Sequence, residues 1–95
     1  MIKVGICEDD KEQAMRIREI AERGLFKRTE YEIKCFSSGE EVIQACENGG
    51  FTVDLLLLDI HMQNVNGLQT AEYIRRHRID VDIIFITVSE KHVYE

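Results

Sequence analysis

Acidic side chains directly follow two apolar stretches that lie far apart in the sequence. Glu8 and Asp9 come after the stretch 2–7, and Asp59 comes after four consecutive leucines. Carboxyl groups with a pKa near ~4 are ionised at pH ~7, and two such charges ~4 Å apart repel by roughly 4 kcal/mol at an effective dielectric of ~20. If folding gathers the three acids, one is protonated or a cation binds. Their oxygens suit Mg²⁺, which could screen a phosphoryl group while a carboxylate attacks phosphorus.

Several residues that could join such chemistry also fit an ordinary structural role. A single acid such as Asp59 can simply end a strand, and Thr87 can be a β-branched strand residue. Ser89 suits a helix cap better than catalysis. The histidines lie far apart in the sequence, so we do not expect their rings to act as bases or metal ligands; they are His61, His77 and His92.

Four apolar stretches are expected to form strands. The leucine run before Asp59 has neither a helical nor an alternating period, which is typical of a strand buried on both faces. We expect the first strand over Ile2–Cys7 and the last over residues 83–87. Tyr31–Phe36 alternates between uncharged and charged residues, which indicates a strand with one wet face at the edge of a sheet.

The segments between these strands carry helix start signals. Capping-box spacing occurs in three pairs, which are Asp10 with Gln13, Ser38 with Glu41, and Asn66 with Gln69. We expect a helix to begin at each pair, with Gly24 ending the first helix and residues 48–50 ending the second. Residues at helical spacing are expected to face the core: Ala14, Ile17, Ala21, Leu25, Val42, Ile43, Cys46, Leu68, Ala71 and Ile74. The tail from Ser89 opens like a further helix.

The element order predicts an α/β fold with a flavodoxin-like parallel sheet. Right-handed crossovers between alternating strands and helices place helices on both faces of the sheet. Because the second strand is the wet edge, the strand order 2-1-3-4 follows. The chain then reverses direction between the first and third strands, which is where such folds bind ligands. The carboxyl ends of these two strands carry Glu8, Asp9 and Asp59, so the three acids should meet there.

Length and composition fit one small domain. The chain has 95 residues, of which 44% are hydrophobic, and this is enough to build a core. A net charge of −6 argues against a nucleic-acid surface in this segment. No apolar stretch approaches the roughly 20 residues that span a bilayer, and the start reads as a strand rather than a signal peptide, so we expect a cytoplasmic protein without membrane contact.

The cysteine pattern suggests neither a disulfide framework nor a zinc site. The count is odd, and no two of Cys7, Cys35 and Cys46 are separated by two residues. We expect all three to be small, buried, reduced thiols.

The whole pattern resembles the receiver domain of two-component response regulators. The matching residues are Ile6-Cys7-Glu8-Asp9-Asp10, Asp59, Met62, Gly67 and Ile84-Phe85-Ile86-Thr87. The stretches Ile6-Cys7-Glu8-Asp9-Asp10 and Ile83-Ile84-Phe85-Ile86-Thr87 look most like those of receivers joined to a LytTR-type DNA-binding domain. The resemblance implies that Asp59 accepts a phosphoryl group from a phosphohistidine of a sensor histidine kinase. It also implies a Mg²⁺ ion held by Asp9 directly, by Glu8 through water, by Asp59, and by the backbone carbonyl of His61.

The same resemblance assigns roles to residues around the phosphoacceptor. Thr87 would turn toward the phosphoryl oxygens and bias the following loop, a population shift driven by new charge. Gly67 fits a turn where a side chain would obstruct the entry to the third helix. Two residues depart from the family pattern. Gln63 stands where proline is usual, and Val88 stands where a small residue is usual and could crowd the phosphorylation pocket.

The largest departure concerns the family's fifth strand, with its phosphoryl-binding lysine, and its last helix. Neither is found in the sequence. Lys91 lies too soon after Thr87 to replace the lysine, and Tyr94 is a poor candidate for the aromatic residue that takes part in the family's switch. The strand at 83–86 would then be an exposed apolar edge. We therefore expect residues 1–95 to be a C-terminally incomplete receiver domain that regulates transcription through an output domain outside the chain, or one that self-associates by strand or helix exchange. DNA would be contacted only through that output domain.

Two other functions stay open from the sequence. A receiver-like interaction or dimerisation domain that does not use phosphorylation is favoured by Val88 and by the lack of the lysine. A Mg²⁺-dependent phosphatase with an aspartyl nucleophile would have a second Asp two residues after the nucleophile, where this chain has His61. On the receiver assignment the chain is a phosphoacceptor, not an enzyme, apart from phosphorylating and dephosphorylating itself.

Overall fold

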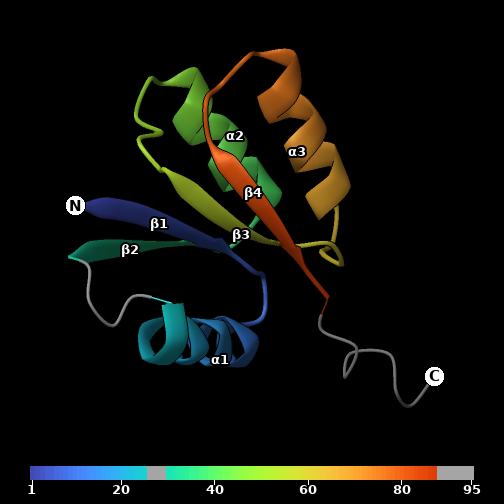
Figure 1. The fold of residues 1–95 in the computed structure, drawn as a ribbon. Helices are drawn as coiled ribbons and strands as arrows, with labels where there is room; N and C mark the ends of the chain where they lie inside the picture. Colours follow the sequence, from blue (N-terminus) through green and yellow to red (C-terminus); the bar gives the residue numbers. More distant parts are fainter. Residues whose placement is uncertain (26–29, 88–95) are drawn as a thin grey trace.

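The computed structural model describes residues 1–25 and 30–87, which form a four-stranded parallel sheet. The strands are β1 (Ile2–Cys7), β2 (Tyr31–Phe36), β3 (Leu55–Asp59) and β4 (Asp82–Ile86). Their order across the sheet is β2-β1-β3-β4, so the predicted order 2-1-3-4 is confirmed (Figure 1). Strands β1 and β3 lie side by side at the centre, and β2 forms the predicted edge, where its charged side chains are exposed.

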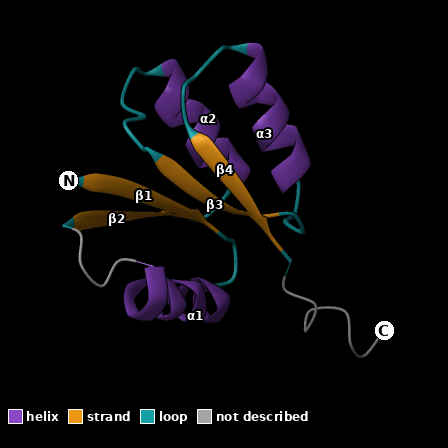
Figure 2. Ribbon diagram, in the orientation of Figure 1, coloured by secondary structure: helices purple, strands orange, loops and turns teal. Residues whose placement is uncertain are grey.

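Helices cover both faces of this sheet. Helix α1 (Lys11–Ile20) lies on one face, and α2 (Gly39–Glu47) and α3 (Gly67–Arg76) lie together on the other (Figures 1 and 2). Helix α1 continues as a π-helical turn, η1 (Ala21–Leu25). Gly24 was expected to end the first helix, but it lies inside this turn. The predicted tail helix from Ser89 lies outside the described residues.

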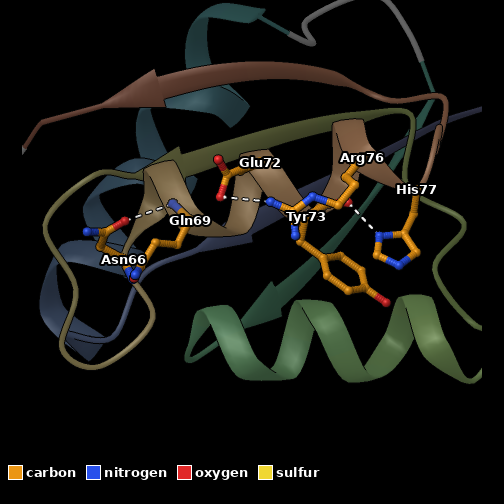
Figure 3. Close-up of polar contacts among 6 residues, drawn as sticks. All are labelled: Asn66, Gln69, Glu72, Tyr73, Arg76 and His77. Atoms are coloured by element: carbon orange, nitrogen blue, oxygen red, sulfur yellow. Dashed lines mark hydrogen bonds and ion pairs between the residues drawn. The ribbon is translucent and has the colours of Figure 1, made fainter.

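All three predicted helix starts are capped by the expected side chains. The Asp10 carboxylate accepts hydrogen bonds from the backbone N–H groups of Glu12 and Gln13 at 2.9 and 3.2 Å. Ser38 Oγ accepts from the Glu41 N–H at 3.1 Å. The Asn66 and Gln69 side chains each accept from the other's backbone N–H, at 2.8 and 2.9 Å, which completes a capping box (Figure 3 draws one of these bonds). These bonds satisfy N–H groups that have no partner inside the helix.

The leucine run separates two hydrophobic cores, one on each face of the sheet. Leu56 and Leu58 belong to the core under α2 and α3, whereas Leu57 belongs to the core under α1 with Ile17 and Ala21. This arrangement confirms that β3 is buried on both faces. It also explains why the run shows no alternation, because apolar residues are needed on both sides of a central strand.

Two predictions of buried side chains are wrong. Leu68 is 55% exposed, because the buried stripe of α3 consists of Gly67, Thr70, Ala71 and Ile74, and Leu68 falls outside it. Cys35 is exposed as well. It lines an open groove with Lys11 and Ala14 at the start of α1 instead of packing beneath that helix. Cys7 is buried as expected, and Cys46 is half-buried.

Candidate functional site

The three acids singled out in the sequence lie together at the carboxyl ends of β1 and β3. Cys7 pairs with Leu58 across the two strands, so Glu8 and Asp59 continue side by side beyond that pair. Each of Glu8, Asp9 and Asp59 offers one carboxylate oxygen, and these three oxygens lie within 4.8 Å of one another. The strand order brings this cluster together although 50 residues separate Asp9 from Asp59 in the chain.

Backbone N–H groups orient all three carboxylates. The Asp10 N–H donates to Glu8 Oε2 at 3.1 Å, and the His61 N–H donates to Asp59 Oδ1 at 3.2 Å. The Gln63 N–H, in the loop between β3 and α3, donates to Asp9 Oδ2 at 3.2 Å. The cluster is therefore held in place by loops whose geometry the sheet determines.

Burial of two of the three acids raises the free energy of holding their negative charges close together. Asp59 is 0% exposed and Glu8 is 3% exposed, whereas Asp9 faces solvent. At an effective dielectric of ~20, charges ~5 Å apart repel by roughly 3 kcal/mol per pair. The pKa of the neighbouring Cys7 thiol is raised to about 12. Burial of the thiol is the largest cause, followed by the negative charges of Glu41, Glu8, Asp59 and Asp9. The site therefore favours a cation.

The donor set fits a magnesium ion. Three carboxylate oxygens are hard ligands, and Mg²⁺ binds few protein groups while keeping several waters, which the exposed side of Asp9 allows. Neither a thiolate nor an imidazole belongs to the cluster that the described residues form. The His61 side chain is exposed, and its backbone N–H is directed to Asp59.

Gly67 allows α3 to begin directly against the site. A Cβ atom added at Gly67 would overlap the Asp59 carbonyl oxygen and lie 2.8 Å from Ile60 Cα. The Gly67 N–H donates to the Ile60 carbonyl at 3.1 Å. The first turn of α3 therefore touches the backbone of Asp59, and a side chain at Gly67 would push the helix away from it.

Beside the acids lies an open groove that sequence reasoning did not anticipate. Its lining residues are Asp9, Asp10, Ile60, His61, Met62, Gln63, Asn66 and Leu68. Met62 anchors the wall of the groove, because the Cys7 thiol approaches its sulfur at 3.7 Å. The exposed apolar side chain of Leu68 is explained by this position. The sequence held no signal for this position, because Leu68 has helical spacing with Ala71 and Ile74 and was expected to face the core with them.

Of the remaining sequence candidates, the structure describes Thr87, which follows β4. Ile86 is the register partner of Asp59, and the Ile60 N–H donates to the Ile86 carbonyl at 3.0 Å. Thr87 is the next residue and is exposed. Thr87 therefore comes directly after Ile86, the residue of β4 that pairs with Asp59. Val88, Lys91 and Tyr94 lie outside the described residues.

Comparison with known proteins shows the family. The model of the response regulator receiver domain matches residues 4–95. The transcriptional regulatory protein NatR of Bacillus subtilis is 36% identical over 89 residues, which cover 92% of this chain and 35% of NatR. The response regulator SaeR of Staphylococcus aureus is 31% identical over 62 residues, which cover 65% of this chain and 26% of SaeR. The chain thus spans about a third or less of these relatives.

Solved structures agree with this result. The response regulator MaeR bound to beryllium trifluoride is 25% identical with a TM-score of 0.77, over 93% of this chain and 68% of MaeR. The response regulator TrrA of Thermotoga maritima, in complex with Mg²⁺ and beryllium fluoride, is 29% identical with a TM-score of 0.70, over 99% of this chain and 76% of TrrA. With the parallel sheet and the acid cluster at its carboxyl edge, these matches mean that the chain belongs to the response regulator receiver domain family.

Proposed function

We propose that Asp59 is the phosphoacceptor of this receiver domain and that Glu8, Asp9 and Asp59 hold the Mg²⁺ ion, together with the backbone carbonyl of His61. Receiver domains accept a phosphoryl group on an aspartate, and Mg²⁺ is general to the family. The observation that supports the assignment is the cluster of three carboxylate oxygens within 4.8 Å at the carboxyl ends of β1 and β3. Asp59 is the one member that ends a strand.

Asp59 is suited to act as the nucleophile. Its Oδ1 accepts the His61 N–H, which fixes the orientation of the carboxylate. A carboxylate oxygen of Asp59 attacks phosphorus, the bond from phosphorus to the donor's imidazole nitrogen breaks, and the electron pair leaves with that nitrogen. When bound, Mg²⁺ neutralises charge on the phosphoryl oxygens. Glu8 and Asp9 contribute by holding the metal and not by touching phosphorus.

The response to phosphorylation would pass through β4. We propose that Thr87 turns toward the phosphoryl oxygens, because it follows Ile86, the strand neighbour of Asp59. The new charge would bias the segment after Thr87 between two arrangements. Val88 would limit the space at the phosphorylation pocket in this proposal, and Gly67 would keep α3 in contact with the Asp59 backbone.

The wider setting is also a proposal. A sensor histidine kinase would supply the phosphoryl group in the cytoplasm, and the full protein would regulate transcription through a LytTR-type output domain. The name of NatR, a transcriptional regulatory protein of which this chain matches 35%, supports a longer regulator. Self-association by strand or helix exchange at β4 is supported by Ile84 and Phe85, which are large and exposed. Among the described residues, no helix combines the length and apolar character needed to cross a bilayer.

Phosphorylation of the intact protein by acetyl phosphate or phosphoramidate tests the central assignment. We expect Mg²⁺-dependent incorporation of one phosphoryl group, lost in Asp59→Asn and strongly reduced in Asp9→Asn. Asp10→Asn is the matched control, because it removes one charge beside the cluster while asparagine caps a helix as well as aspartate does. Labelling of a folded Asp59→Asn protein, or no labelling of the folded wild type, would contradict the proposal. In the second case the alternative of a phosphorylation-independent interaction domain would take its place.

A further inference from the structure

The carboxyl end of α3 concentrates positive charge on an acidic chain. Arg75, Arg76, His77 and Arg78 are consecutive, and all four are exposed. We call this segment the cationic turn. The chain as a whole carries a net charge of −6, so this turn stands out against its surroundings. Figure 1 shows that this end of α3 is the end away from the loop that joins it to β3, so the turn is remote from the acid cluster.

Arg78 occupies a backbone conformation that normally selects glycine. Its φ is +55°, one residue past the C-cap His77. The Ile79 N–H donates to the Ile74 carbonyl and the Arg78 N–H donates to the Arg75 carbonyl, both at 3.1 Å. These two bonds define a Schellman motif, whose left-handed position is usually glycine and sometimes asparagine. An arginine in this conformation is strained, so the shape of the backbone does not explain why the residue at position 78 is an arginine.

Local contacts do not use the charge of Arg78 either. Arg76 pairs with Glu72 at 3.3 Å, one turn earlier in the helix. Neither Arg75 nor Arg78 forms an ion pair with any residue in the described ranges 1–25 and 30–87. The helix dipole favours cations in the last turn, which accounts for Arg75 and Arg76, but its effect falls off within that turn. Arg78 lies beyond it.

The geometry of the turn is fixed before any partner binds. The His77 ring stacks on the Tyr73 ring with centroids 4.0 Å apart and an angle of 24° between the planes. His77 Nδ1 lies 3.0 Å from the Tyr73 carbonyl, which can only accept, so Nδ1 donates (Figure 3). With the Schellman bonds, these contacts hold the backbone that carries Arg75 and Arg78, which lowers the entropy lost on binding.

We propose that the cationic turn is a docking surface for an acidic protein segment, with Arg75 and Arg78 as the residues that contact it. Two guanidinium groups that form no ion pair within the described part of the chain match carboxylates in geometry and in charge. Nucleic acid is disfavoured, because a single turn offers few phosphate contacts and the remainder of the chain is acidic. The partner would bind at the opposite end of α3 from Gly67, so docking and phosphoryl transfer would not compete for the same surface.

Fluorescence anisotropy with the intact protein and a labelled octaglutamate peptide tests this proposal. We expect salt-sensitive binding that weakens about tenfold in the double variant Arg75→Gln with Arg78→Asn, since exposed charge pairs each contribute a modest amount. Asparagine tolerates the left-handed conformation, so the melting temperature should not fall. Arg78→Lys should lose part of the affinity, because lysine keeps the charge but cannot bind a carboxylate through two parallel hydrogen bonds.

Arg23→Gln is the matched control. Arg23 lies in η1, on the face of the sheet opposite α3, and is 84% exposed in its pair with Glu19. This variant loses one positive charge, half of what the double variant loses, so an effect of net charge alone would weaken binding about threefold. Weakening of that size in Arg23→Gln would overturn the proposal. Tighter binding of a 20-base-pair DNA duplex would overturn it in favour of nucleic acid. Equal binding of octaglutamine, or no binding of octaglutamate, would overturn it as well.

Discussion

The two ends of α3 differ in how closely they follow local sequence rules. At the amino end, Asn66 and Gln69 form a complete capping box, and Gly67 stands where no Cβ fits. At the carboxyl end, the Schellman motif has Arg78 at the position that favours glycine. The first end touches the backbone of the proposed phosphoacceptor, and the second end faces solvent. The amino end of α3, which contacts the site, therefore has the residues that local preferences predict. The carboxyl end has an exposed charged residue where local preferences predict glycine.

The physical contrast lies in what each end contacts. Gly67 is buried against the Asp59 carbonyl, so any change there is transmitted to the acid cluster. Arg78 is exposed, and the turn is anchored to the core through Ile79, which packs against the cluster that contains Ile74. Substitutions at the first end should therefore affect folding and phosphorylation together, whereas those at the second should affect stability slightly and phosphorylation not at all.

Gly67→Ala should have the largest effect. The added Cβ would overlap the Asp59 carbonyl, and backbone on both sides must shift, so we expect a loss of about 3 kcal/mol in the free energy of unfolding. Urea denaturation measures this loss, and labelling with acetyl phosphate should fall in the fraction that stays folded. Gly24→Ala is the control, since nothing lies within 4 Å of its added Cβ. A similar loss in both variants would contradict the argument from close approach.

Asn66→Ala should cost about 1 kcal/mol. It removes the cap acceptor for the Gln69 N–H and leaves the backbone unchanged. Asn66→Ser keeps an acceptor at the cap and should stay close to the wild type. Chemical denaturation of both variants separates the capping bond from the other role of Asn66, which is to line the groove beside the acids. Equal destabilisation by serine and alanine would show that the groove contact dominates.

The amino end of α3 and the acid cluster could be read from the sequence because both depend on short-range signals. A capping pair spaced by three residues and an apolar run ending in an acid are local patterns. The strand order then follows from the handedness of crossovers, which leaves few alternatives. This is why the sequence alone predicts that Glu8, Asp9 and Asp59 lie together, although their roles as ligands and phosphoacceptor stay predictions.

The misses have physical causes in particular residues. Leu68 was placed in the core because hydrophobicity was used to find the buried face, but that face starts with Gly67 and Thr70, which are small or polar. Thr70 can be buried because its hydroxyl donates to the Asn66 carbonyl at 2.9 Å. Cys35 was misplaced because the alternation of a strand does not reveal where the covering helix begins. The Schellman motif was not predicted at all, because its usual signal is glycine.

Arg78→Gly should stabilise the protein by about 0.5 kcal/mol. Relief of the left-handed strain is worth roughly 1–2 kcal/mol, and the greater freedom of glycine in the unfolded chain offsets part of it. Arg75→Gly is the control, because Arg75 lies in the last turn of α3 and there glycine should cost about 0.5–1 kcal/mol. The two variants remove the same side chain and should shift the urea midpoint in opposite directions. A shift in the same direction would refute the strain at Arg78.

Glu72→Gln should have the smallest effect and should depend on salt. The Glu72–Arg76 pair spans one helical turn at 3.3 Å, and both side chains are largely exposed, so it is worth about 0.3 kcal/mol at low ionic strength. The acid precedes the base in the chain, which is the favourable order relative to the helix dipole. In ~1 M NaCl the screening length shortens to ~3 Å, so the difference from the wild type should vanish. A double-mutant cycle with Arg76→Gln isolates the pair. A coupling energy that persists at high salt would mean that the contact is not ionic, and that Arg76 is held by packing rather than by Glu72.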